Sequence, residues 1–408
     1  MKFSRAGVAA AAVCALTAVS ASAQPLRFDD VIRNLRNPDP KARLSAIQLL
    51  RNAKYPEAIG PIAPLVVDPV DDVQLEAIAA ELSFFVDQDL KPRHMVGFVI
   101  ERRNPAVGTT AFDLGPLAVI PRPPPADLVS SLLKAVDDEN PAVRLDAIYA
   151  VGVITKPPLT ADQSAQLIKA LDHFDPAVRS AAAEVIGRLR VTAAADALIK
   201  AVNDSHAEVR YSAMRALGAI REPRALGALT EQFAFYRKGE GAASALQGLA
   251  DIGSPSSVPL FKAHIEDKDP NLRRAAVEGL GRAGDSSQLD TIGRLVTADD
   301  SAMVRTASEF AMQKLGHDYV SRLVDALYDE KVTAQAQEYL MELGRSTLPA
   351  VVPRLRDPDP GVRQAVAEVL GALGDDSTIP ALQAAAQDSN SSVAAAAKNA
   401  IEKIQLRG

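Results

Sequence analysis

The chain has 408 residues, no tryptophan and a single cysteine, and its 51 acidic residues outnumber its 45 basic ones, giving a formal net charge of −6. This balance, without any Lys/Arg-rich run, argues against a nucleic-acid partner, because such binding depends on a positive protein surface. One cysteine also excludes a disulfide pair or a cluster of thiolate metal ligands within the chain.

The first element in chain order is an export signal over residues 1–23. A basic start, MKFSR, precedes an apolar stretch, and Ala21-Ser22-Ala23 fits the small-x-small pattern that signal peptidase accepts. We expect cleavage after Ala23 and a periplasmic or secreted mature chain. The apolar run is too short for a membrane span, and the residues before Cys14 match a lipidation motif poorly. Without its signal, the chain would contain no cysteine.

A segment with a shared pattern then recurs along most of the chain. Its clearest copies are DPKARLSAI from Asp39, DPAVRSAAAEVIG from Asp175, DPNLRRAAVEGLG from Asp269 and DPGVRQAVAEVLGALG from Asp359. Degenerate copies that lack the arginine lie around Gln74, Ala242, Thr333 and Ala394. A period of about 31 residues is the length of one helix pair. The sequence therefore predicts an all-α fold, an α-α superhelix of about eleven helix-pair repeats stacked as one rod from end to end.

The residues of one copy explain how its second helix forms. The Asp-Pro pair supplies a capping carboxylate, followed by a proline at the first helical position, where no hydrogen bond is lost. In the copy from Asp175, Val178, Ala182, Val185 and Ile186 recur at helical spacing, which predicts one buried stripe. Glycines near the ends of these helices, such as Gly187 and Gly316, are expected to stop the helix or to permit close packing. The predicted organisation is residues 24–87 as N-terminal repeats, 88–124 as an insertion and 125–408 as the main solenoid.

The D-P-x-V-R-x-x-A core with a following L-G resembles the HEAT repeat in its bacterial phycobilisome-lyase-like form. The resemblance implies a ladder of hydrogen bonds between the repeat arginine and an aspartate six residues before it, with interruptions at the four copies without arginine. The ladder residues expected are Asp138, Arg144, Arg179, Asp204, Arg210, Asp267, Arg273, Asp299, Arg305, Asp357 and Arg363.

Residues 88–124 break the period. They join apolar runs, a Gly-Thr-Thr turn and a proline cluster that cannot be helical. Two interpretations stay open: a long packed connection between repeats, or an arm that decorates one face and binds a ligand. The apolar run MVGFVIE within it fits either a strand or a short helix.

The chain carries no recognisable catalytic motif. HEAT-fold hydroxylases that resemble deoxyhypusine hydroxylase hold iron through repeated His-Glu pairs, and no such pair occurs among His94, His173, His206, His264 and His317. Protease, P-loop and dinucleotide-binding motifs are also missing. Phycobilin lyases, the other enzymes of this repeat type, act in the cytoplasm, whereas an exported chain is expected here. We therefore expect no cofactor, no metal and no enzymatic activity.

The remaining candidate site is the concave face, which second helices line in HEAT proteins. The positions there combine aromatic, arginine and acidic residues, types that anchor protein partners. The candidate protein-binding residues are Tyr149, Glu184, Tyr211, Arg215, Arg274, Glu278 and Phe310, with Gln247 and Glu368 at equivalent positions. The alternative is that these side chains are simply exposed to solvent and bind no partner. A nearby cluster from Phe233 to Lys238 is either a degenerate turn or a binding lip.

The sequence thus predicts an exported, non-catalytic scaffold that binds protein or peptide partners. The alternative is a regulatory or assembly subunit of an envelope enzyme complex whose catalytic chain lies elsewhere.

Overall fold

A computed structural model of the protein describes residues 28–88, 90 and 107–407. Apart from an isolated antiparallel bridge between Val86 and Val119, the secondary structure of these residues is helical. They form eleven stacked helix pairs, which confirms the predicted superhelix. No helix in this part of the chain is long and apolar enough to cross a membrane. The expected export signal and the MVGFVIE run lie outside the described residues.

Each pair, numbered here as repeats 1 to 11, has a first and a second helix. The first helices are α1 (Phe28–Asn34), α3 (Ile59–Ile62), α6 (Ala126–Ala135), α8 (Ala161–Ala170), α10 (Ala195–Ala201), α12 (Leu226–Tyr236), α14 (Val258–His264), α16 (Leu289–Ala298), α18 (Val320–Asp325), α20 (Leu348–Val351) and α22 (Ile379–Ala385). The second helices are α2 (Pro40–Asn52), α4 (Asp71–Phe85), α7 (Pro141–Ile154), α9 (Pro176–Arg188), α11 (Ala207–Ala219), α13 (Gly239–Ile252), α15 (Pro270–Ala283), α17 (Ala302–Lys314), α19 (Thr333–Leu343), α21 (Pro360–Leu373) and α23 (Ser391–Gln405). One further helix, α5 (Val107–Asp113), belongs to no pair.

The second helices begin as the sequence predicts. The Asp175 carboxylate accepts the Ala177 N–H at 3.0 Å, with proline at the first helical position. Asp39, Asp269 and Asp359 cap α2, α15 and α21 in the same way. These caps fix where the four helices start, so the repeat arginine of each falls in its first turn.

Neighbouring second helices pack closely through small residues. The predicted stripe of Val178, Ala182, Val185 and Ile186 is fully buried. A Cβ added at Gly187 would lie 3.1 Å from the Cα of Ala216 in the next repeat, so this glycine permits close approach of two helices. Other glycines end helices instead. Gly316, for example, has a left-handed φ of 93° directly after α17.

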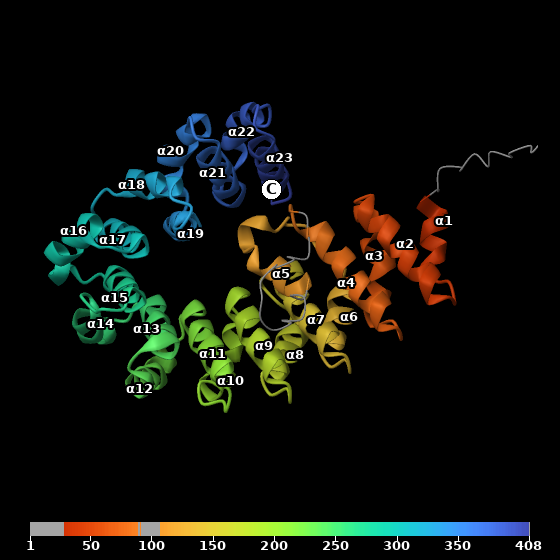
Figure 1. The fold of residues 1–408 in the computed structure, drawn as a ribbon, viewed down its shortest axis with the longest axis horizontal. Coiled ribbons are helices and arrows are strands. Elements are labelled where there is room, and N and C mark those ends of the chain that lie inside the picture. The colour runs from red at the N-terminus through yellow and green to blue at the C-terminus, as the bar shows by residue number, and fades with distance from the viewer. Residues whose placement is uncertain (1–27, 89, 91–106, 408) are drawn as a thin grey trace, which may run out of the picture.

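The stack curves into a ring, a closure that the rod-like stack expected from the sequence does not include. In Figure 1 the repeats curve from α4 through α11 and α17 until α23 comes back beside the region of α5, while α1 and α2 project outside the ring. The second helices of repeats 4 to 11 lie on the inner side and the first helices on the outer side. All second helices run in the same sense. The ring therefore has an N-terminal rim, where they begin, and a C-terminal rim, where they end.

The ring closes through the described part of the insertion, residues 107–122, which we call the closure segment. Helix α5 packs on α7, with so little space that a Cβ at Gly108 would lie 2.6 Å from the Asp146 carbonyl oxygen. Beyond α5, the 3-10 turn η3 (Pro116–Ala118) contacts α21. Of the two interpretations of the insertion, its described part thus fits a packed connection, but one that links the two ends of the ring.

Candidate functional site

The predicted ladder is present at the N-terminal rim. Arg179 donates two hydrogen bonds to Asp204, at 2.8 and 2.9 Å, and one to its own repeat at the His173 carbonyl. Arg273 binds Asp299 in the same bidentate way. Partial burial acts against ionisation of Asp204, but hydrogen bonds from Arg179 and the His206 N–H outweigh it and lower the pKa of Asp204 to about 2. The ladder therefore consists of charged pairs that join consecutive repeats.

Other ladder positions depart from the simple pattern. Arg144 pairs with the capping Asp175 at 2.7 Å. Arg210 donates to the hydroxyl of Tyr236, at a turn that has no aspartate. Arg305 hydrogen-bonds only to backbone carbonyls, those of Asp299 and Asp300, among the described residues.

The remaining aspartates show what happens where the arginine is missing. Asp138 accepts a hydrogen bond from the Gln74 amide at 2.8 Å, so the interruption expected at Gln74 is wrong: glutamine takes the place of arginine there. Asp357 accepts from Tyr328 instead of an arginine of repeat 9. Asp267 receives no repeat arginine and accepts from His264 at 2.9 Å.

Two ladder carboxylates were not among the predicted residues. Asp68 pairs with Arg43, and Asp388 pairs with Arg363. Each lies six residues before the arginine-less position of a degenerate copy, Gln74 or Ala394. The six-residue spacing, applied to those copies as well, would have found both.

The candidate inner-face residues form a second chain of polar contacts from repeat to repeat. The Tyr149 hydroxyl donates to Glu184 at 3.0 Å, and Glu184 also accepts from Ser212 at 2.9 Å. Further along, Gln247 donates to Glu278 at 2.8 Å. In repeats 9 and 10, Gln337 of α19 donates to Glu368 of α21 at 2.9 Å. Most of this row is therefore engaged within the protein.

The expectation that Glu278 and Phe310 point outward is wrong, because both are buried. Helix α19 covers them. The Tyr339 ring stacks on Phe310 with 4.3 Å between centroids, and its hydroxyl donates to Glu278 at 2.6 Å. Repeat 9 lacks the Asp-Pro-x-Val-Arg start, and its second helix approaches repeats 7 and 8 from inside the ring.

Charges around Glu278 converge at the C-terminal rim. Burial alone would raise the pKa of Glu278, but Arg274 and Arg282 outweigh it and hold the pKa below its usual value. Arg282 also pairs with Glu342 of α19 at 3.0 Å, and Glu342 pairs with Arg221 of repeat 5 at 3.2 Å. These contacts join repeats 5, 7 and 9 across the inner side of the ring.

One group of side chains where α11, α12 and α13 meet stays open to solvent, and we call it the Tyr211 patch: Tyr211, Arg215, Phe235, Tyr236 and Glu240. The Tyr236 ring lies 5.5 Å from that of Tyr211 and 5.0 Å from that of Phe235. Phe235 is 73% exposed, and the Arg215 side chain is 43% exposed and 3.6 Å from Glu240. The predicted cluster from Phe233 to Lys238 thus divides, because Phe233 is buried whereas Phe235 faces solvent.

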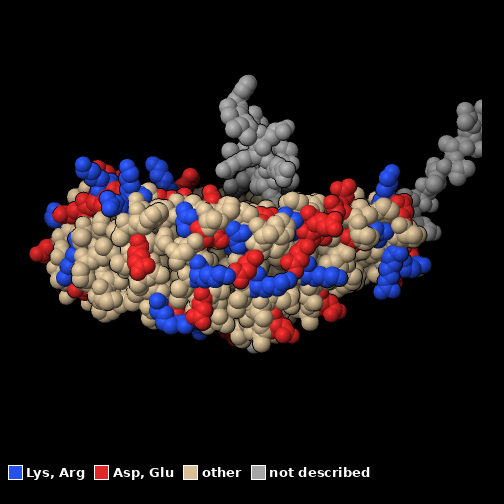
Figure 2. All heavy atoms as spheres, turned by 90° about the horizontal axis from the view of Figure 1, so that it is seen from below, with Lys and Arg blue, Asp and Glu red and all other residues tan. Residues whose placement is uncertain are grey.

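The face of the molecule seen in Figure 2 offers no concentration of one charge. Lysine, arginine and acidic side chains alternate in a band across the face seen in Figure 2. Exposed pairs between neighbouring repeats, such as Lys169–Asp137 and Lys200–Asp172, have the same mixed character. Within residues 28–88, 90 and 107–407, no group of three or more His, Cys, Asp or Glu side chains converges as metal ligands would.

The geometry defines an α-solenoid of helix pairs with an arginine ladder, and comparison with known families specifies it further. A family model described as HEAT repeats matches residues 164–234, 238–313 and 320–402, together more than half of the chain. The chain therefore belongs to the HEAT-repeat family. No curated protein shows significant similarity to the sequence.

Several solved structures are similar in fold. An engineered protein shares 17% identity, over 93% of this chain and 98% of that one, with a TM-score of 0.42. Kap121p bound to RanGTP shares 14% identity over 92% of this chain and 44% of its own length, with a TM-score of 0.39. The complex of CpcE and CpcF of phycocyanin lyase from Nostoc sp. PCC7120 shares 24% identity over 62% of this chain and 95% of that chain, with a TM-score of 0.36.

Proposed function

We propose that this protein is an exported, non-catalytic scaffold that binds a protein or peptide through the Tyr211 patch, where helices α11, α12 and α13 meet. One observation supports the proposal most directly. Phe235, Tyr211 and Arg215 lie together with exposed surface, whereas Glu278 and Phe310, at the positions equivalent to Arg215 in later repeats, are buried. Aromatic and arginine side chains dominate binding energy at protein interfaces. HEAT solenoids also offer extended inner surfaces to partners.

The proposal includes two finer assignments. Export rests on the basic start, apolar stretch and Ala21-Ser22-Ala23 site of residues 1–23. The bacterial phycobilisome-lyase-like repeat type rests on the D-P-x-V-R-x-x-A core of the clearest copies. N-terminal sequencing of the protein recovered from a periplasmic extract tests export, and we expect a chain that begins at Gln24. A chain recovered only from the cytoplasm, beginning at Met1, would contradict it.

Capture experiments test the binding surface. We expect Tyr211→Ala combined with Phe235→Ala to remove the partners that the wild-type protein retains from an envelope extract. Phe174→Ala is the matched control, because Phe174 is 79% exposed but belongs to repeat 4, away from the patch. Direct titration of a retained partner should then show weaker binding only for the double variant. Equal capture by all three proteins would rule out the patch.

A further inference from the structure

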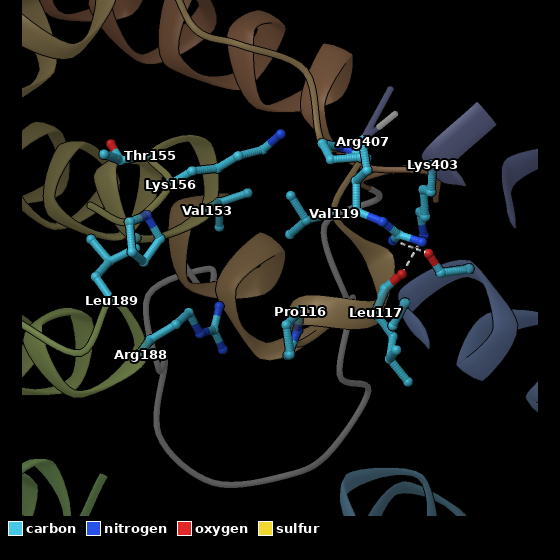
Figure 3. Close-up of a pocket in the computed structure, with 15 residues that line it drawn as sticks. Pro116, Leu117, Val119, Val153, Thr155, Lys156, Arg188, Leu189, Lys403 and Arg407 are labelled. Atoms are coloured by element: carbon cyan, nitrogen blue, oxygen red, sulfur yellow. Dashed lines mark hydrogen bonds between the residues drawn. The ribbon is translucent and has the colours of Figure 1, made fainter. Parts of the chain in front are cut away.

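A pocket at the C-terminal rim is distinct from the Tyr211 patch. It lies where the closure segment meets the ends of α7, α9, α21 and α23, and its volume is about 280 Å³ (Figure 3). This is just below the range of roughly 300–1,000 Å³ that is usual for ligand sites. The pocket is thus large enough for a small molecule or the last residue of a peptide, but not for a folded surface.

The charged residues that line this pocket are all cations. They are Lys156, Arg188, Lys403 and Arg407, and no Asp or Glu is among the lining residues. A second pocket on the other side of the closure segment is lined by the opposite charge, through Asp87, Asp113, Glu338 and Glu368. Positive and negative side chains are thus separated between two neighbouring pockets. This separation distinguishes the basic pocket from the outer surface, where charges of both signs alternate.

The four cations differ in how far the protein already satisfies them. Lys403 pairs with Asp87, and Arg407 donates to the carbonyl oxygens of Gly371 and Gly374. Lys156 has no hydrogen bond or ion pair with the described residues, and its side chain extends toward Arg407 (Figure 3). Arg188 donates to the Phe112 carbonyl, but its Nη1 is buried without a partner. Donors therefore remain for an anion.

The pKa shifts of two of these cations and a buried hydroxyl also indicate a site for an anion. Burial and the neighbouring Arg407 charge lower the pKa of Lys156, and burial lowers the pKa of Arg188 to about 10. Both cations thus lack full compensation by protein carboxylates. Thr155, which also lines the pocket, is only 7% exposed and has a hydroxyl without a hydrogen-bond partner. Unpaired buried polar groups are rare in native proteins, and a bound ligand is one way to satisfy them.

The rest of the lining is apolar. Pro116, Val119, Val153 and Leu189 face the same space as the cations (Figure 3). A bare phosphate ion would leave these side chains without a contact, whereas an uncharged apolar molecule would leave Lys156 and the Nη1 of Arg188 without a partner. A ligand with one negative group and a short apolar body satisfies both parts of the wall.

We propose that this pocket binds a carboxylate that carries a small apolar body, with the carboxylate at Lys156 and Arg407 and the body along Val119 and Val153. The same chemistry is present in a free short-chain organic acid and in the C-terminal residue of a peptide. Lys156 follows repeat 3 and Arg407 follows α23 of repeat 11. The bound carboxylate therefore bridges the two sides of the ring closure and stabilises it.

Calorimetric titration of the purified full chain with hexanoate tests the proposal. Hexanol and inorganic phosphate are the control ligands, because each has only one of the two required features. We expect binding of hexanoate alone, together with slower amide exchange in α23. Lys156→Gln should raise the Kd about tenfold, as expected for a lost charge-assisted contact, and Lys156→Arg should restore it. Lys134→Gln, which removes an exposed lysine of α6, should change nothing.

A second titration distinguishes the two sources of the carboxylate. A short peptide that ends in leucine with a free carboxylate is compared with its amidated form. Competition with hexanoate by the acid form only assigns the site to a peptide terminus, and hexanoate binding without such competition assigns it to a free organic acid. If hexanoate binds no better than hexanol or phosphate, or if Lys156→Gln binds it like the wild type, the proposal is wrong.

Discussion

Different kinds of contact join the repeats at the two rims of the ring. At the N-terminal rim, each contact links neighbours, such as Arg179 with Asp204, and the same geometry recurs from repeat to repeat. At the C-terminal rim, several contacts occur only once and link distant repeats, such as Lys403 with Asp87 and Arg282 with Glu342. Periodic contacts between neighbouring repeats set the rise of a solenoid. In this protein, the non-periodic contacts between distant repeats close the solenoid into a ring.

The pKa values of the carboxylates also differ between the ladder and the closure. Ladder carboxylates such as Asp204 and Asp388 have lowered pKa values, because arginine and backbone N–H groups stabilise their charge. At the closure, burial raises the pKa of Asp87 despite its contact with Lys403, and burial raises the pKa of Asp146 to about 6. The ladder thus stabilises charge, and the closure contains carboxylates that are costly to ionise.

The largest effect is expected from Lys403→Ala. This change leaves Asp87 and the Leu117 carbonyl without the lysine in a buried site. Removing one partner of a buried pair should lower the free energy of opening the closure by about 3 kcal/mol, so that amides of α23 exchange roughly a hundredfold faster. Hydrogen–deuterium exchange measures this. Lys398→Ala, at an exposed position of the same helix, is the control and should exchange like the wild type.

A smaller loss of stability is expected at the ladder, where two repeat arginines with different partners can be compared. Arg179→Ala removes two hydrogen bonds to a largely buried carboxylate and should lower the free energy of unfolding by about 2 kcal/mol. Arg305→Ala removes an arginine that binds only backbone carbonyls among the described residues, so its loss should be clearly smaller. Urea denaturation compares the two variants. Equal losses would mean that the ladder carboxylates contribute nothing to stability.

An effect no larger than that at the ladder is expected from pH, through the contact of α5 with Asp146. The pKa of Asp146 is raised from 3.8 to about 6 in the folded protein, so the folded state favours the protonated carboxyl. Its contribution to stability is fully present below about pH 4 and is lost as the pH rises through 6. We expect the wild type to lose about 2 kcal/mol between pH 4 and pH 6.

Asp146→Asn isolates that contribution. The amide oxygen can still accept the Gly108 N–H, as the carboxylate does at 2.6 Å, but the side chain no longer ionises. Denaturation between pH 4 and 7 should therefore show a flatter profile for the variant. A variant profile as steep as that of the wild type would assign the pH dependence to other groups.

The sequence predicts the contacts at the N-terminal rim well and those at the C-terminal rim poorly. The reason is how far apart along the chain the contacting residues lie. Caps, ladder pairs and the buried stripe of α9 depend on residues within one repeat or the next, so the Asp-Pro and arginine spacing is sufficient to place them. The Lys403–Asp87 pair joins residues 316 positions apart, and no periodic pattern marks either residue. Similarly, the burial of Phe310 depends on Tyr339 in a degenerate copy, whose displaced helix could not be inferred from the repeat pattern.

The central claim is that residues 107–122 close the solenoid into a ring, and the distance between repeats 3 and 11 tests it most directly. Spin labels at cysteines replacing Ser130 and Gln405, both exposed, report this distance when Cys14 is replaced by serine. We predict a single narrow distance distribution, equal to the separation in the closed ring, that broadens and lengthens in Lys403→Ala. A broad, long distribution in the protein with intact Lys403 would show that the solenoid is open in solution.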